Sequence, residues 1–420
     1  MMGVPRGDGF RRTALPNGVR VVTMTRSDTP LAAVKMFFNV GSRHDGEYPG
    51  LAHFVEHVLL SHAGSPAART VYDAVEGLGG ELNAVTTREY TALQAVVLAS
   101  HVEHIVNLFA GLLAPSPIDR IAFEREREII RQELLLQHDS SQIIWDVFLR
   151  ALWDGHPLAQ PILGTPEILE TIPLRAVADH LRYYRAAERI VLAAAGNVDH
   201  DALVHVTASR FGSLPSGVPM QPAPSPPGHA GNGFVERETS QTHFVLGVDG
   251  VALSDPRRYP LRVLEIVLGR GASSRLHRAL RSDRGYVYAV SVVAMSYADR
   301  GYFAVYTASA PERLAAVQAI VIDELDRLRR GGVSEAELAR AKVIYEAALA
   351  RDFETVLSVA SILGIEELLH KVESFQDSVA RINTVDVEQV RRAAAELLIP
   401  ERGAVAAVGR WLPDVRVLTG

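Results

Sequence analysis

The sequence of 420 residues contains no cysteine, which excludes disulfides, cysteine nucleophiles and thiolate metal sites together. Any bound metal must therefore be held by histidine, aspartate or glutamate side chains. The chain is not basic either, because its formal net charge is −6 with the 15 histidines counted as neutral. Such a balance gives no electrostatic footprint for nucleic acid, so we expect no nucleic-acid partner.

Long hydrophobic runs are missing as well. The longest apolar stretches, such as residues 95–99 and 190–195, are far shorter than the ~18–20 residues needed to cross a bilayer. Residues 1–13 include three arginines but no apolar segment and no small-residue cleavage site of a secretory signal. We therefore expect a cytoplasmic protein with no membrane partner. Its 48% hydrophobic and 22% charged residues are typical of a globular protein.

One segment divides the chain nearly in half. Residues 214–232 are dense in proline, glycine and serine, which is typical of an extended, semi-rigid linker. A chain of 420 residues, compared with roughly 150 residues per domain, predicts two or three domains. We therefore expect an N-terminal domain over residues 1–213 and a C-terminal domain over residues 233–420.

The two halves contain a weak internal repeat. Residues 81–86 (ELNAVT) align with residues 286–291 (YVYAVS) at an offset of 205 residues. In each half a β-rich run, two helices and a final apolar strand follow. The expected helices span residues 100–113 and 119–137 in the first half, and residues 311–330 and 334–349 in the second. The final strands span residues 190–195 and 403–408. We therefore predict an α+β fold of two homologous domains, each an antiparallel or mixed β-sheet covered by helices.

The strongest chemical signal is the segment HFVEH at residues 53–57, within an apolar run of helical periodicity. Positions i and i+4 share a helix face, so His53 and His57 can present their imidazoles to one metal ion, with Glu56 nearby as a general base. The alternative is that this spacing arises by chance on an amphipathic helix. Residues 101–104 (HVEH) show such a chance pattern, whose i, i+3 spacing is typical of a solvated helix face.

A third ligand must come from elsewhere, and residues 123–133 (FEREREIIRQE) offer carboxylates. Glu126 and Glu133 are seven residues apart, two turns along one helix face. An exposed helix with alternating charges explains most of this segment. It explains Glu133 poorly, because three leucines follow that residue.

Together these motifs show a resemblance that covers nearly the whole chain. The chain resembles the pitrilysin/insulinase zinc peptidases, and most closely the half-length members that look like mitochondrial processing peptidase subunits. The matching segments are residues 15–22, 41–43, 53–57, 79–86, 155–158, 163–165, 183–185, 195–198, 238–243 and 271–276. Residues 59–65 depart from the family pattern, which leaves the shape of the substrate subsites open.

The resemblance implies roles for residues of the first half. His53, His57 and Glu133 would bind Zn²⁺, since Glu133 follows His57 at the family's separation of 76 residues. Glu126 would be the acidic residue that holds a ligating histidine from behind. The edge strand beside the zinc would bind the substrate as an added β-strand; the residues in this place are Asn83, Ala84, Val85 and Thr86.

In the second half, Arg281 and Tyr288 match a family pair that reaches into the site, where they would hold substrate carbonyls and the oxyanion. From the residues alone, a surface Arg281 and a Tyr288 in the sheet core are the preferred alternative. At a local offset of 210 residues, Val263, Ile266 and Val267 replace His53, Glu56 and His57. The second half is therefore predicted to have no metal site.

The expected function is that of a zinc endopeptidase acting on peptides or unfolded segments. A non-catalytic structural or partner subunit is one alternative, and a leader-peptide processor working with a paralogous chain is another. In full-length family members the zinc comes from the first quarter of the chain and the Arg/Tyr pair from the last. A half-length chain would reproduce this by pairing, so a homodimer is the simplest hypothesis and a heterodimer the alternative.

Overall fold

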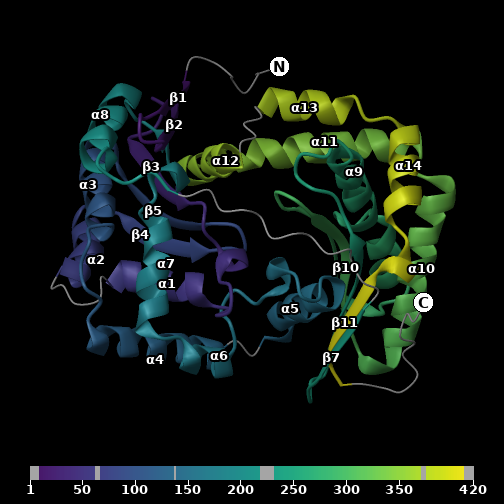
Figure 1. Cartoon of the computed structure of the whole chain (residues 1–420). Coiled ribbons are helices and arrows are strands. Elements are labelled where there is room, and N and C mark those ends of the chain that lie inside the picture. The colour runs from purple at the N-terminus through teal and green to yellow at the C-terminus, as the bar shows by residue number, and fades with distance from the viewer. Residues whose placement is uncertain (1–8, 62–66, 137–138, 218–230, 370–374, 411–420) are drawn as a thin grey trace. The chain divides into compact units, whose positions relative to one another are not determined.

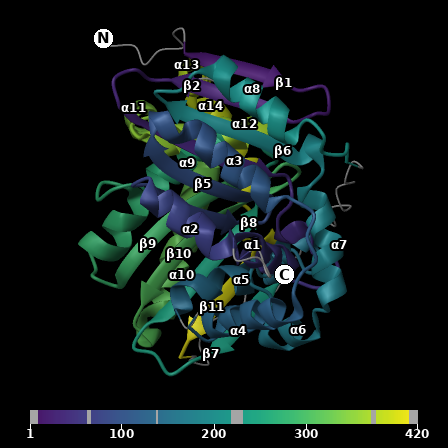
Figure 2. The ribbon, with the colours of Figure 1, turned by 90° about the vertical axis from the view of Figure 1, so that its left-hand side faces the viewer.

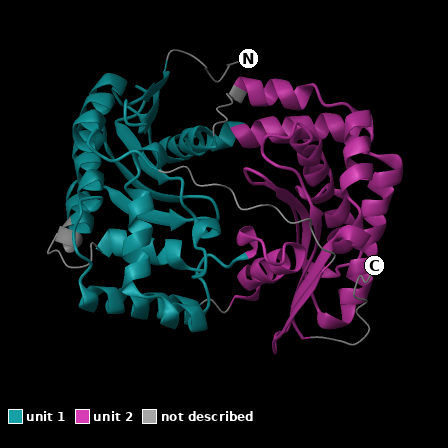
Figure 3. Cartoon of the chain, in the orientation of Figure 1, with its two compact units in different colours: residues 1–136, 160–222, 350–375 teal, residues 137–159, 223–349, 376–420 magenta. Residues whose placement is uncertain are grey.

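The computed structural model describes residues 9–61, 67–136, 139–217, 231–369 and 375–410, so most of the predicted linker at residues 214–232 lies outside the described residues. The chain forms two compact units (Figure 3). Unit 1 comprises residues 1–136, 160–222 and 350–375, and unit 2 comprises residues 137–159, 223–349 and 376–420. None of the described helices is long and apolar enough to span a membrane.

Unit 1 contains a six-stranded sheet in the order β1-β2-β6-β3-β5-β4. Its strands are β1 (Phe10–Ala14), β2 (Arg20–Thr25), β3 (Leu31–Phe38), β4 (Glu81–Thr86), β5 (Thr91–Leu98) and β6 (Ile190–Gly196). Its helices are α1 (Leu51–Ser61), α2 (Ala67–Gly77), α3 (Val102–Leu112), α4 (Arg120–Leu136), α6 (Pro166–Thr171), α7 (Leu174–Tyr184), α8 (His200–Phe211) and α12 (Val356–Leu368).

Unit 2 contains a five-stranded sheet in the order β7-β11-β8-β10-β9. Its strands are β7 (Asn232–Glu236), β8 (Thr242–Asp249), β9 (Val287–Ser296), β10 (Gly301–Ser309) and β11 (Ala404–Gly409). Its helices are α5 (Ser140–Leu152), α9 (Arg258–Gly269), a π-helix (His277–Ser282), α10 (Leu314–Gly331), α11 (Glu335–Asp352), α13 (Phe375–Asn383) and α14 (Val387–Leu397).

The two sheets repeat one topology. In unit 1, β6 pairs parallel with β2 and antiparallel with β3, and β5 and β4 follow antiparallel. In unit 2, β11 pairs parallel with β7 and antiparallel with β8, and β10 and β9 follow antiparallel. Both sheets are mixed and carry helices, so the prediction of an α+β fold with two homologous halves is confirmed.

Each sheet is covered on one face by a helix that comes from the other half of the sequence. On the sheet of unit 1, α3 and α8 pack on one face, and α12 packs on the other, against β2, β3 and β6 (Figure 2). On the sheet of unit 2, α5 packs against β7, β8 and β11 (Figure 1). The compact units therefore do not follow the order of the chain.

This exchange of α12 and α5 between the halves of the sequence explains why the final strand of each half is apolar at every position. In β6, Val191, Ala193 and Ala195 contact the side of α12, while the intervening residues face the main core of unit 1. All residues of β6 and β11 are buried. A strand covered on both faces has no polar side, so it reads as a continuous apolar run instead of an alternating one.

A substitution at Gly364 of α12 would test how closely this helix packs on the sheet. A Cβ atom at Gly364 would overlap the ring of Phe37 in β3, which is fully buried and cannot move aside. We expect Gly364→Ala to destabilise the protein by roughly 1–3 kcal/mol through overpacking, despite alanine's better helix propensity. The measurement is the midpoint of thermal unfolding.

The matched control is Gly111→Ala in α3, where an added Cβ meets no atom within 4 Å. There alanine should stabilise the helix by up to about 1 kcal/mol. Equal shifts of the unfolding midpoint in both variants would contradict close packing of α12 at Gly364.

Candidate active site

The start of α1 is fixed by a buried carboxylate. Asp45, which is 4% exposed, accepts hydrogen bonds from the backbone N–H groups of Gly50 and Ala52, each at 2.8 Å. Gly50 has a φ of +99°, and a Cβ there would lie 2.8 Å from the carbonyl oxygen of Leu163. The role of Asp45 was not predicted from the sequence, because a helix-capping residue normally directly precedes its helix and Asp45 stands six positions before Leu51.

α4 packs beside α1 through stacked aromatic rings. The rings of Phe54 in α1 and Phe123 in α4 lie 4.9 Å apart between centroids and are nearly parallel, at 7°. The guanidinium of Arg127 lies 4.8 Å from the centroid of Phe123 and donates to the carbonyl oxygen of Ile172 at 2.8 Å. This contact fixes which face of α4 is turned towards α1.

The three predicted metal ligands come together on these two helices. Oε2 of Glu133 lies 3.6 Å from Nε2 of His53 and 3.5 Å from Nε2 of His57. Bonds of ~2.0–2.2 Å to a tetrahedral ion would separate ligand atoms by about 3.3–3.6 Å, so these donors fit a metal such as zinc. Among the described residues this is the only cluster of three or more such side chains with metal-binding geometry.

Glu126 lies behind His57. Its Oε2 atom is 3.5 Å from Nδ1 of His57, and the side chain is almost completely buried. Burial lowers the pKa of His57, but hydrogen bonding to Glu126 and the charges of Glu133 and Glu56 outweigh it, so the pKa is raised. For His53, burial and then the charge of His57 lower the pKa to about 3. Nδ1 of His53 is buried with no hydrogen-bond partner among the described residues, so only His57 has a carboxylate behind it.

Glu56 lies on the same helix but outside the ligand cluster. It is 8% exposed, and its Oε2 atom accepts a hydrogen bond of 2.5 Å from the hydroxyl of Thr86. Burial raises the pKa of Glu56, although the hydrogen bond from Thr86 and the charge of His57 act against this. Thr86 was predicted to belong to the substrate-binding strand, but its contact with Glu56 was not predicted, because nothing in the sequence shows which face of the strand is turned to α1.

β4 is an edge strand of its sheet. It pairs with β5 and is the last strand in the sheet order of the described residues. Asn83 and Val85 are exposed, whereas Leu82 and Ala84 pack against the main core of unit 1. Thr86 is buried and connects this strand to Glu56. The strand therefore combines an open edge with a direct contact to the candidate site.

The remaining predicted site residues belong to unit 2. Arg281 lies in the π-helix and is exposed, and Tyr288 lies in the edge strand β9 with 72% of its surface exposed. The alternative that Tyr288 belongs to the sheet core is therefore wrong. On α9, Val263, Ile266 and Val267 are buried in the hydrophobic core, in place of the histidines and glutamate of α1.

Comparison with known proteins identifies the family. Residues 20–166 match the model described as Insulinase (Peptidase family M16), and residues 174–345 match the model described as Peptidase M16 inactive domain. The chain therefore belongs to peptidase family M16, as the resemblance to half-length pitrilysin/insulinase peptidases implied.

Relatives agree with this assignment, and a solved structure shows the same fold. An uncharacterized zinc protease of Mycobacterium tuberculosis is 36% identical over 403 residues, which cover 94% of this chain and 92% of the relative. The uncharacterized zinc protease YmxG of Bacillus subtilis is 29% identical over 391 residues, covering 92% and 95%. The crystal structure of a protease from Helicobacter pylori has the same fold, with a TM-score of 0.87, 20% identity and coverage of 95% and 99%.

The position of Glu126 behind His57 leads to a test. Glu126→Gln removes the charge that orients this imidazole, so affinity for Zn²⁺ should fall about 10-fold or more. The measurement is a zinc titration in competition with a chromophoric chelator. Glu128→Gln is the matched control on the same helix, because Glu128 is half exposed and pairs with Arg131. Equal affinities of the two variants would contradict the proposed contact.

Proposed function

We propose that this chain is a zinc-dependent endopeptidase that hydrolyses peptides or unfolded protein segments. The observation that carries the proposal is the convergence of His53, His57 and Glu133 on one point, with Glu56 on the same helix and outside the ligand cluster. The relatives are named uncharacterized zinc proteases, which supports the same chemistry.

The described residues supply three candidate ligands, so a tetrahedral ion held by them would keep a fourth position for water or substrate, as in catalytic rather than structural zinc sites. Bound there, zinc would polarise the substrate carbonyl and lower the pKa of a water molecule to ~7. Within the protein, Glu126 orients His57 through Nδ1, so that Nε2 faces the ligand position. The raised pKa of His57 reflects the carboxylates around it, a charge surplus that suits a divalent cation.

Glu56 is suited to move the proton. Thr86 donates to Oε2, which leaves Oε1 as the oxygen that takes a proton from the attacking water. Because burial raises the pKa of Glu56, the carboxyl group can hold this proton and then deliver it to the leaving amine. Thr86 thereby fixes the rotamer of the base.

The substrate would bind along β4 as an additional strand. The edge formed by Asn83, Ala84, Val85 and Thr86 can pair with the backbone of an extended peptide. Backbone pairing makes few demands on side chains, which suits varied peptides. Since Thr86 contacts Glu56, a peptide bound here would lie next to the catalytic base.

Arg281 and Tyr288 would complete the site from a second copy of the chain, in a homodimer. Both side chains are exposed, and Tyr288, with 72% of its surface exposed, lies on the edge strand β9, so both are accessible to a second chain. A guanidinium and a phenol can hold substrate carbonyls and donate to the oxyanion of a tetrahedral intermediate. Pairing with a paralogous chain would serve the same chemistry.

The role of Glu56 is tested by Glu56→Gln, with His57→Ala for comparison. Glu56→Gln should retain one zinc per chain, because Glu56 is not a ligand, and lose at least ~100-fold in turnover of a quenched peptide library. His57→Ala should lose the metal. Glu103→Gln, in the segment HVEH of α3, is a matched control that should leave both quantities unchanged.

Two results would contradict the proposal. Zinc loss by Glu56→Gln equal to that of His57→Ala would make Glu56 a ligand instead of a base. A zinc-loaded wild-type protein that cleaves no peptide of the library would favour the non-catalytic partner subunit.

The shared site is tested by mixing two inactive variants, Glu56→Gln and Tyr288→Phe, under conditions that allow subunit exchange. If Tyr288 serves the other chain, each mixed dimer has one doubly damaged site and one intact site. Random pairing should then restore roughly a quarter of the wild-type activity. If Tyr288 serves its own chain, every site keeps one lesion. Absence of recovery despite demonstrated exchange would reject the shared site.

A further inference from the structure

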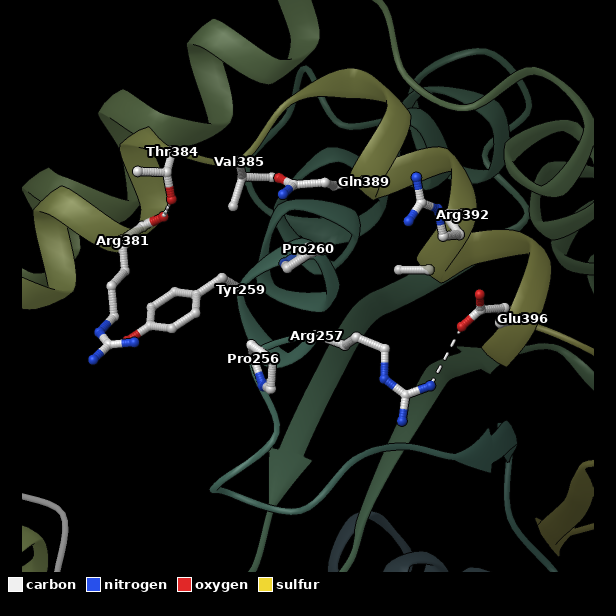
Figure 4. Close-up of a pocket in the computed structure, with 11 residues that line it drawn as sticks. Pro256, Arg257, Tyr259, Pro260, Arg381, Thr384, Val385, Gln389, Arg392 and Glu396 are labelled. Carbon is white, nitrogen blue, oxygen red and sulfur yellow. Dashed lines mark hydrogen bonds and ion pairs between the residues drawn. The ribbon is translucent and has the colours of Figure 1, made fainter.

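A pocket of about 420 Å³ lies on unit 2, where the first turn of α9, the end of α13 and one face of α14 meet (Figure 4). Its volume is within the range of ~300–1,000 Å³ that is typical of small-molecule sites. The lining residues are Pro256, Arg257, Tyr259, Pro260, Arg381, Thr384, Val385, Gln389, Arg392, Ala393 and Glu396. None of them belongs to the candidate active site.

The lining is rich in positive charge. It contains three arginines and one glutamate, and Arg381 and Arg392 lie on opposite sides of the pocket (Figure 4). Arg257 is already neutralised, since it pairs with Asp255 at 2.7 Å and with Glu396 at 3.3 Å. Arg392, by contrast, forms no ion pair with any carboxylate of the described residues. Its guanidinium is exposed and therefore free to pair with an anion in the pocket.

Arg391, the neighbour of Arg392, shows that this lack of a partner is not general along α14. It makes two hydrogen bonds with Glu388, at 2.6 and 2.8 Å, and does not line the pocket. Two adjacent arginines on one helix thus have different surroundings. Arg391 pairs with Glu388 outside the pocket, and Arg392 lines the pocket.

Gln389 adds hydrogen-bond donors with a fixed orientation. Its side-chain Oε1 atom accepts a hydrogen bond of 3.0 Å from the backbone N–H of Asp386. The backbone N–H of Gln389 in turn donates to Oδ1 of Asp386 at 2.7 Å, which completes a capping box. The side-chain amide group, Nε2, therefore has both hydrogens available, and no described acceptor uses them. Gln389 and Arg392 are three residues apart on α14 and line the same wall (Figure 4).

Much of the remaining lining is apolar. The proline rings at positions 256 and 260 and the buried ring of Tyr259 lie across from α14, and the buried side chains of Val385 and Ala393 lie beside Gln389 and Arg392 (Figure 4). The hydroxyl of Thr384 is used within the fold, because it donates to the carbonyl oxygen of Arg381. The pocket thus combines the donors of Arg392 and Gln389 with apolar surface from Pro260, Tyr259 and Val385.

We propose that this pocket binds a small carboxylate that carries an apolar group. The guanidinium of Arg392 and the amide of Gln389 hold the carboxylate, and the apolar group packs against Tyr259 and Pro260. A carboxylate matches a guanidinium well because it can accept two parallel hydrogen bonds. This assignment is independent of the peptidase activity, since it concerns only residues of unit 2.

The experiment measures binding of 3-phenylpropionate to the full chain by isothermal titration calorimetry in a buffer without carboxylates. The wild-type protein should bind it saturably, with one site per chain. Acetate lacks the apolar group and 3-phenylpropan-1-ol lacks the charge, so both should bind at least about 10-fold more weakly. Equal binding of the alcohol, or no saturable binding of 3-phenylpropionate, would overturn the proposal.

Matched variants locate the site. Arg392→Gln should weaken binding of 3-phenylpropionate at least about 10-fold, whereas Arg391→Gln, with the same change of charge, should leave it unchanged. Gln389→Glu is a second variant that keeps the capping box but replaces the amide donors with a negative charge, so it should also weaken binding. If Arg392→Gln and Gln389→Glu both bind as the wild type does, the carboxylate does not bind in this pocket.

Discussion

The fold depends on one packing constraint, which is that each sheet must be covered on both faces. Strands β6 and β11 are buried at every position, so neither sheet has a face that tolerates water. The helices between the strands of each half cover one face, and a helix from the other half, α12 or α5, covers the second. Burial of apolar area is the main favourable term in folding, and here much of it is available only when both halves are present. The two halves are therefore interdependent in stability even though their topologies are separate.

The candidate site places charged side chains within this apolar framework, so the cost of burying their charge decides its electrostatics. Glu126 and Glu56 are almost completely buried, and Glu133 lies within 3.6 Å of both histidines. Burying several carboxylates beside one another is costly unless positive charge compensates for them. Two imidazoles compensate only when protonated, and His53 resists protonation because burial lowers its pKa to about 3. A divalent cation held by His53, His57 and Glu133 would supply the missing charge, so the carboxylates that are costly to bury would favour metal binding.

Local patterns made part of this structure predictable from the sequence. The repeat, the long helices and the shared face of His53 and His57 depend on spacings of a few residues, and these were correct in kind and nearly correct in limits. The exchange of α5 and α12 was not predictable, because an amphipathic or apolar helix does not indicate which sheet it will cover. The hydrogen bond from Thr86 to Glu56 and the cap by Asp45 depend on three-dimensional contacts between segments with no shared pattern. The pocket of unit 2 is a further case, since its walls come from residues 256–260 and 381–396.

The comparison of α1 with α9 shows how one scaffold supports two different roles. In α9, apolar residues at the positions of His53, Glu56 and His57 extend the hydrophobic core. In α1, the same positions carry polar side chains that add nothing to the hydrophobic core, and the helix is held in addition by Asp45 at its start and by the stacking of Phe54 on Phe123. The polar residues His53, Glu56 and His57 are thus accompanied by stabilising contacts at both the end and the side of the helix. Since these contacts hold the helix that carries His53 and His57, a change at Asp45 or Phe123 should alter the candidate site without replacing any predicted metal ligand.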